Sequence, residues 1–300
     1  SFTQTLALTQ AAERAGFTAA LLAEHYAASS GRADRMAADA WVFLGALARE
    51  TTRIRLGTLV SPVTFRHPSV LAKLAATLDH LSGGRAELGL GAGWLAAEHA
   101  AFGFPFPAGP ARVDLLEEQL QVITGLWSQY PFSHHGPHYQ LETCYFTPRP
   151  VQQPRPPILI GGTPTSTRLP QLAARYADEY NLGLGAPAAC RATRERLDRA
   201  CARLGRAPET LSLSLFAGVC VGETELEVAR SLDRLRAGAR PHMQDLDTWI
   251  TGTPEQAAAK LRTLAAAGVQ RLMFSVEHEV HGEMVTLLGE RVLPLVNAAA

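Results

Sequence analysis

Short apolar runs alternate with amphipathic stretches along the whole chain. The apolar runs have the length and composition of buried strands, and they cover residues 18–25, 53–60, 85–92, 156–162, 178–182, 211–222 and 271–277. The amphipathic stretches repeat their apolar residues at helical spacing, and they cover residues 36–50, 66–80, 112–128, 166–176, 188–204, 223–237, 254–267 and 282–298. Strands and helices that alternate in this way form right-handed βαβ units with a parallel sheet.

The chain opens on a predicted helix and not on a strand. Residues 1–17 combine an N-cap-like serine, helical apolar spacing and a glycine near their end. The seven runs are one strand short of a (β/α)8 barrel, which the length and the repeat spacing otherwise suit. We therefore expect an α/β fold of the (β/α)8 TIM barrel type whose first strand is missing from this numbering. The alternative is an open sheet of seven strands.

No linker or repeat divides the sequence, so we predict a single domain over residues 1–300. Two connections, 129–155 and 236–252, are too long to be simple loops. Long insertions that follow barrel strands are typical of lids and binding walls. We expect these two segments to border the substrate.

The composition excludes several classes of protein. The chain carries 28 basic and 28 acidic residues and no net charge, so a nucleic-acid partner is not expected. No apolar run reaches 18 residues and no signal peptide is present, which predicts a protein without a membrane anchor. Four cysteines form no C-x-x-C pair, which favours a reduced, cytoplasmic protein. The HHGPH segment at 134–138 has no further ligand at a suitable spacing, and no metal is predicted.

Glycines occupy alternate positions at Gly89, Gly91 and Gly93, at the end of an apolar run. Glycine weakens a strand, so it marks a place where a ligand or another backbone approaches closely. The spacing does not fit the dinucleotide motif G-x-G-x-x-G, because Trp94 stands at its last position. In a barrel these residues lie at the carboxyl-terminal mouth, where active sites are built. Two interpretations stay open: a flat cofactor against the backbone, or tight packing of strand and helix.

A second glycine pair precedes a hydroxyl-rich turn that opens a helix. Free backbone N–H groups and the positive end of a helix dipole bind anions, and an arginine adds charge. The predicted phosphate site comprises Gly161, Gly162, Thr165, Ser166, Thr167 and Arg168. The alternative is an ordinary helix N-cap with spare hydroxyl groups.

These segments together resemble a known superfamily. Residues 53–107 and 150–181, with the ending GTPEQAAAKLRTLAAAGVQRLMFSVE, are similar to the luciferase-like flavin-dependent monooxygenases and reductases. The chain looks closest to the members that use the 5-deazaflavin coenzyme F420. The resemblance implies a (β/α)8 barrel with the flavin-type ring at its mouth, beside Gly91, Ala92 and Gly93. It also implies a cis peptide bond between Leu59 and Val60, backing the ring.

The resemblance further implies roles for individual side chains. Glu24 and His25 match an acidic-histidine pair near the ring, where the histidine passes protons. The alternative for His25 is a structural hydrogen bond at a strand end. Arg112 matches an arginine that reaches the flavin phosphate, and Trp94 either walls the substrate pocket or packs. From the sequence itself, Glu98 and His99 fall on the first turn of a helix near the mouth; we expect a solvated helix start, and the alternative is contact with the substrate.

Two departures limit what is carried over. Some luciferase-type members have an arginine where Ala92 stands, contacting the flavin phosphate, so its absence counts against FMN. A sugar-phosphate dehydrogenase branch has a catalytic glutamate where Trp94 stands, so that branch's substrate is not carried over.

We therefore expect an F420-dependent oxidoreductase that transfers a hydride to or from a small organic substrate. The first alternative is an FMN-dependent monooxygenase that uses O2 and reduced flavin from a partner flavin reductase. The second is a non-catalytic flavin-binding protein. Relatives commonly pair, so a homodimer is expected.

Overall fold

The computed structural model describes residues 1–27, 37–238, 248–275 and 281–297. The chain forms two compact units. The first comprises residues 1–2, 18–161 and 167–179, and the second comprises residues 3–17, 162–166 and 180–300. That residues 1–300 form a single domain stays a prediction.

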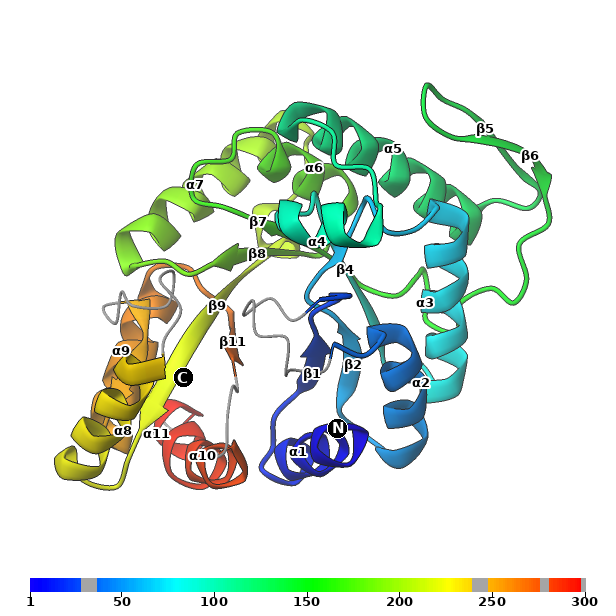
Figure 1. Ribbon diagram of the computed structural model, residues 1–300. Helices are drawn as coiled ribbons and strands as arrows, with labels where there is room; N and C mark the ends of the chain where they lie inside the picture. The colour runs from blue at the N-terminus through cyan, green and yellow to red at the C-terminus, as the bar shows by residue number, and fades with distance from the viewer. Residues whose placement is uncertain (28–36, 239–247, 276–280, 298–300) are drawn as a thin grey trace. The chain divides into compact units, whose positions relative to one another are not determined.

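The first unit is a parallel α/β arrangement (Figure 1). Its strands pair in the order β1, β2, β4 and β7, and a short β3 joins β4. They are β1 (Ala19–Leu22), β2 (Arg55–Thr58), β3 (Ser61–Pro62), β4 (Ala86–Gly91) and β7 (Ile158–Gly162). The helices are α2 (Ala40–Glu50), α3 (Pro68–Ser82), α4 (Ala96–Phe102), α5 (Gly109–Ser128) and α6 (Leu169–Tyr176).

Apolar periodicity explains why these elements form. Every residue of β4 is buried, as expected for a strand covered on both faces. Helix α3 begins with Pro68 at its first position and ends at Gly83, whose φ of 65° suits glycine. Its buried face includes Leu71 and Leu78, and it packs against both α2 and α5.

The insertion at 129–155 contains an antiparallel hairpin that the sequence did not predict. Its strands are β5 (Phe132–His135) and β6 (Gln140–Cys144) (Figure 1). Glu118 of α5 fixes the hairpin, because its carboxylate accepts hydrogen bonds from the backbone N–H groups of His138 (3.0 Å) and Tyr139 (2.8 Å). The histidine-rich segment is thus anchored to a helix, and its role as a substrate wall stays a prediction.

The second unit is built around the ten-residue strand β9 (Ser212–Val221). Strand β9 pairs with β8 (Glu179–Gly183), β10 (Ile250–Gly252) and β11 (Arg271–Ser275). The longer helices are α1 (Phe2–Arg14), α7 (Pro187–Arg203), α8 (Glu225–Gly238) and α9 (Pro254–Ala266). Shorter segments are a 3₁₀ turn (Pro208–Thr210), α10 (His281–Leu287), a π-helical turn (Leu288–Val292) and α11 (Leu293–Asn297).

Each of the seven apolar runs contains a strand, and the predicted parallel pairing is confirmed in both units. Strand β10 was missed, because it has only three residues and lies at the end of the segment 236–252. Within the described residues, none of the helices has the length and apolar composition that crossing a bilayer requires.

Candidate active site

The residues that the sequence singles out lie mainly at the carboxyl ends of the first unit's strands. The side chains inside β4 are buried, whereas Leu59, Val60, Ala92 and Gly93, just beyond β2 and β4, are partly exposed. The next residue, Trp94, is 61% exposed. Parallel α/β folds bind their ligands at this end of the strands.

The peptide bond between Leu59 and Val60 is cis, as the resemblance implies. The neighbouring glycines make room for this bulge. A Cβ atom on Gly91 would lie 2.6 Å from Cγ2 of Val60, and one on Gly161 would lie 3.1 Å from Cγ1 of Val60. A Cβ atom on Gly89 would lie 1.9 Å from the carbonyl oxygen of Thr58. Gly89 and Gly91 are therefore required for close packing against residues 58–60. Contact of the glycines with a cofactor ring stays a prediction.

Gly93 and Arg112 shape the chain after β4. Gly93 has a φ of 78°, a conformation that favours glycine. The guanidinium of Arg112 donates to the carbonyl oxygens of Ala92 (2.9 Å) and Pro107 (2.5 Å) and lies 3.9 Å from the ring centre of Phe106. Arg112 thus holds the backbone beside the bulge, and its contact with a phosphate stays a prediction.

His25 follows β1 and meets a buried carboxylate. Its Nδ1 lies 2.9 Å from Oε2 of Glu98, and the two side chains are 18% and 1% exposed, respectively. The ring of Trp94 stands edge-on to His25 at a centroid distance of 6.0 Å. The predicted proton-transfer residue is therefore held between a carboxylate and an indole.

Glu98 is a residue that sequence reasoning placed wrongly. It was expected at a solvated helix start, together with His99, but the two residues are 2% and 1% exposed. Both lie in α4, where small and apolar neighbours surround them in the sequence. That apolar setting, LAAEHAAF, is the signal that could have indicated burial.

His99 has a structural role, because its ring connects α4 to Thr64. Its Nδ1 lies 2.9 Å from the carbonyl oxygen of Leu95, and its Nε2 lies 2.6 Å from Oγ1 of Thr64. A carbonyl only accepts, so Nδ1 carries the proton and Nε2 accepts from Thr64. The ring also contacts Phe65 and Phe106, so both edges and a face of His99 are occupied.

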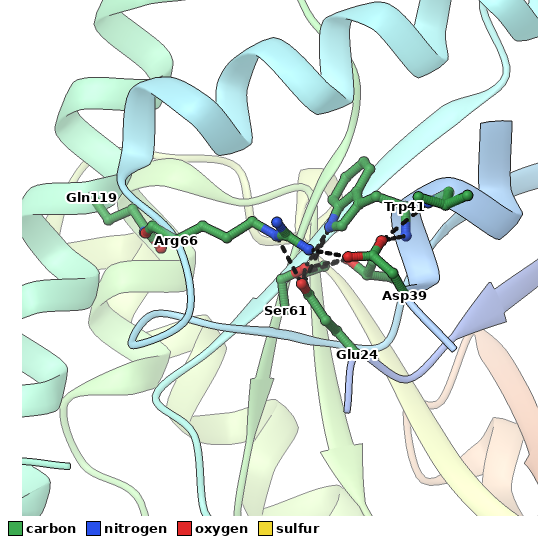
Figure 2. A network of polar contacts seen from close by, with 9 residues as sticks. Glu24, Asp39, Trp41, Ser61, Arg66 and Gln119 are labelled. Atoms are coloured by element: carbon green, nitrogen blue, oxygen red, sulfur yellow. Dashed lines mark hydrogen bonds and ion pairs between the residues drawn. The ribbon is translucent and has the colours of Figure 1, made fainter. Parts of the chain in front are cut away.

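Glu24 belongs to a buried polar network (Figure 2), and its part in proton transfer stays a prediction. Its carboxylate accepts from Nε of Arg66 (2.9 Å), from Nε1 of Trp41 (3.2 Å) and from the hydroxyl group of Ser61. Figure 2 shows the Arg66 guanidinium reaching Asp39 as well, with Nη2 2.6 Å from Oδ2. Glu24 and His25 are consecutive, but each side chain has its own set of partners.

The charges of this network support one another. Burial alone lowers the pKa of Arg66, but the carboxylates of Glu24 and Asp39 outweigh it and hold that pKa above its ordinary value. Burial raises the pKa of Asp39, but the backbone N–H of Val42 and the Arg66 guanidinium outweigh it and hold that pKa low. Because Ser61 directly follows the cis bond, the network fixes the bulge.

The hydroxyl-rich turn is divided between the units. In the second unit, Thr163 and Thr165 are exposed, and their hydroxyl oxygens lie 3.3 Å apart. In the first unit, Nη2 of Arg168 lies 2.7 Å from Oδ1 of Asp114 and 3.5 Å from Oε2 of Glu117. The positive charge of Arg168 is therefore balanced by two acidic side chains, and its phosphate contact stays a prediction. Among the described residues, no group of three or more His, Cys, Asp or Glu side chains is arranged to hold a metal ion.

Parallel strands with a histidine–carboxylate contact beyond their carboxyl ends are typical of α/β proteins that bind ligands at this end of the sheet. The chain belongs to the luciferase-like monooxygenase family, whose family model matches residues 1–271.

Relatives of two kinds are similar to this chain. The FMNH2-dependent dimethylsulfone monooxygenase of Pseudomonas putida is 28% identical over 96% of this chain and 86% of its own length. The F420-dependent glucose-6-phosphate dehydrogenase of Microbacterium testaceum is 35% identical over 56% of this chain and 49% of its own length. A solved F420-dependent secondary alcohol dehydrogenase, in complex with an F420-acetone adduct, has a TM-score of 0.85 at 19% identity. That likeness covers 98% of this chain and 95% of the other.

These comparisons confirm the superfamily and the luciferase-like α/β fold that the sequence predicted. They also confirm the enzyme class, a flavin- or deazaflavin-dependent oxidoreductase. The family contains both F420-dependent and FMN-dependent members.

Proposed function

We propose that the chain is an F420-dependent oxidoreductase that transfers a hydride to or from a small organic substrate. The observation that carries this proposal is the group of partly exposed, apolar or small residues at the carboxyl ends of β2 and β4, where Val60 lies close to Gly91 and Gly161. A flat ring packs against a surface of apolar and small residues. The strand ends offer such a surface, because the partly exposed residues there are Leu59, Val60, Ala92 and Gly93. This surface fits a flat ring.

The protein's own groups have distinct tasks in this proposal. The bulge and the Ala92–Gly93 backbone hold the ring, and Trp94 borders the substrate. His25 accepts a proton from the substrate when it is oxidised, or returns one when it is reduced. The cofactor, when bound, accepts or supplies the hydride. The turn at 162–168 is the proposed contact for the cofactor's phosphate, through Gly162, Thr165, Ser166 and Thr167, with Gly161 preceding it.

Two features support F420 over FMN. Ala92 stands where some luciferase-type enzymes have an arginine on the flavin phosphate. The F420-dependent relative from Microbacterium testaceum is 35% identical over its matched part. We further propose that the protein forms a homodimer, is located in the cytoplasm and acts on small-molecule substrates.

The second candidate function is an FMN-dependent monooxygenase. The relative that covers 96% of this chain is FMNH2-dependent, which favours it. Such an enzyme would draw reduced flavin from a partner flavin reductase, insert one oxygen atom of O2 into its substrate and release the other as water, with the two electrons supplied by the reduced flavin.

Titration of the purified chain with F420 and, separately, with FMN decides between the two, with quenching of protein fluorescence as the readout. We expect F420 to bind at least tenfold more tightly than FMN. The reverse order would favour the monooxygenase, and binding of neither by a folded sample would overturn both.

A pair of variants tests whether the ring lies where we place it. Ala92→Trp puts bulk onto the proposed surface, whereas Ala97→Trp puts the same bulk on an exposed position of α4. We expect the first to weaken cofactor binding at least tenfold and the second to leave it unchanged. Equal binding by both would show that the ring lies elsewhere.

A further inference from the structure

We propose that Glu98 is the positioning residue of His25, and that it fixes Nε2 as the proton-transfer atom of the histidine. The part of His25 in proton transfer rests on the proposed function, whereas the contacts of Glu98 with His25, Tyr26 and Ala27 do not.

Glu98 binds three consecutive residues after β1. Its Oε1 accepts from the backbone N–H groups of Tyr26 (2.5 Å) and Ala27 (2.8 Å), and its Oε2 meets Nδ1 of His25 (2.9 Å). A side chain that is 1% exposed cannot replace these partners with water. Glu98 therefore fixes the backbone of the segment and the orientation of the imidazole together.

The contact with Oε2 determines which ring nitrogen carries the proton. A carboxylate only accepts hydrogen bonds, so Nδ1 of His25 must be the donor. In the neutral imidazole the other nitrogen, Nε2, then has the free lone pair. Nε2 lies on a different edge of the ring from the one that faces Glu98, and the His25 side chain is 18% exposed. Nε2 is thus the atom that can take a proton from a substrate.

One short segment supplies both restraints on the ring. Trp94 lies just before α4 and Glu98 lies four residues later, in the first turn of α4, and both side chains contact His25. The carboxylate fixes the edge of the imidazole and the indole restrains its tilt. We therefore infer that residues 94–98 determine the orientation of the His25 ring.

The substitution Glu98→Gln separates this role from a merely structural one. The glutamine oxygen can still accept from Tyr26 and Ala27, but its amide nitrogen then donates to Nδ1 of His25. The proton of the neutral imidazole must move to Nε2. Glu98→Asp keeps an acceptor and should keep the proton on Nδ1.

We would measure the tautomer of His25 by ¹⁵N NMR in the full chain, with His25→Asn to assign its signals among the ten histidines. We expect the protonated nitrogen to be Nδ1 in the wild type and in Glu98→Asp, and Nε2 in Glu98→Gln. Glu142→Gln is the matched control, because Glu142 lies 3.4 Å from His135 in an exposed pair. It should leave His25 unchanged.

A wild-type His25 protonated on Nε2, or a Glu98→Gln variant that keeps the proton on Nδ1, would overturn the proposal. If Glu98→Gln does not fold, the wild-type tautomer alone still decides it. The experiment needs no cofactor, so a failed cofactor titration would sink the proposed function and leave this result standing.

Discussion

At the scale of single residues, the contact between Val60 and Gly91 explains the glycine pattern of β4. The side chain of Val60 occupies the space that a side chain at position 91 would need. Valine is β-branched and has few alternative rotamers, so it cannot easily move aside. The glycine is therefore required by packing in the protein itself, whether or not a ligand is bound.

The substitution Gly91→Ala should destabilise the protein by about 1–3 kcal/mol, the usual cost of overpacking a tight site. The added methyl group would lie 2.6 Å from Cγ2 of Val60. Urea unfolding measures the loss. Gly45→Ala in α2 is the control, because its new methyl group would lie 3.8 Å from Leu81 and alanine favours helices. The explanation fails if Gly91→Ala is as stable as the wild type, or if adding Val60→Ala gives no relief.

The same scale shows what the sequence could and could not predict about the site. The cis Leu59–Val60 bond was predicted correctly, because a resemblance between motifs carries such positions from one chain to another. The role of His25 stays a prediction. The contact between His25 and Glu98 was not predicted, because Glu98 lies 73 residues away in the chain and nothing local indicates the contact. Glu24 was paired with His25 because the resemblance implies such a pair, whereas in the structure the two side chains have different partners, as expected for successive residues of an extended chain.

At the scale of elements, α2 shows how charged groups fix both ends of a helix. At its start, Oδ1 of Asp39 accepts from the backbone N–H groups of Trp41 (2.9 Å) and Val42 (3.1 Å). Beyond its end, the guanidinium of Arg85 donates to the carbonyl oxygens of Ala48 (2.8 Å) and Thr51 (3.0 Å). These contacts supply partners for N–H and C=O groups that a helix leaves unpaired.

The N-cap makes the stability of the protein depend on pH. The pKa of Asp39 is lowered in the folded state, so its contribution is fully present above the ordinary value of 3.8 and is lost as the pH falls through the folded pKa. Asparagine is also a good N-cap, so Asp39→Asn should lose mainly the ion pair with Arg66, about 0.5–1.5 kcal/mol at pH 7.

Unfolding of wild type and Asp39→Asn from pH 7 down to pH 2.5 checks this sign. The difference between them should stay constant above pH 5 and shrink below pH 4. Asp114→Asn, which removes an exposed ion pair with Arg168, should change stability by less than about 0.5 kcal/mol. A difference that grows as the pH falls would contradict the assignment.

The elements themselves were largely predictable, because apolar periodicity reports burial directly. The exceptions are short or locally unusual. Strand β10 has three residues, which is too few for a pattern. The β5–β6 hairpin is held by Glu118, a contact from another element that no local signal in its own histidine-rich sequence reveals.

At the scale of the whole molecule, binding of a cofactor to the folded chain must raise its resistance to heat. A ligand at 100 times its dissociation constant adds about 2.7 kcal/mol to the free energy of unfolding. The hydroxyl groups of the 162–168 turn are proposed to hold the cofactor's phosphate, so a part of this gain should depend on them. Global unfolding thus reports on a local contact.

We expect the phosphate-free ring fragment of F420 to bind at least tenfold more weakly than intact F420, a loss of about 1.4 kcal/mol. Thermal unfolding with each ligand at one concentration measures the difference as a smaller rise in the midpoint temperature. The double variant Thr165→Ala, Ser166→Ala should reduce the difference, because it removes two of the proposed phosphate contacts. Thr263→Ala, at an exposed position of α9, should preserve it. If the double variant still distinguishes the two ligands as the wild type does, the phosphate is bound by other residues, and the turn is an ordinary helix start.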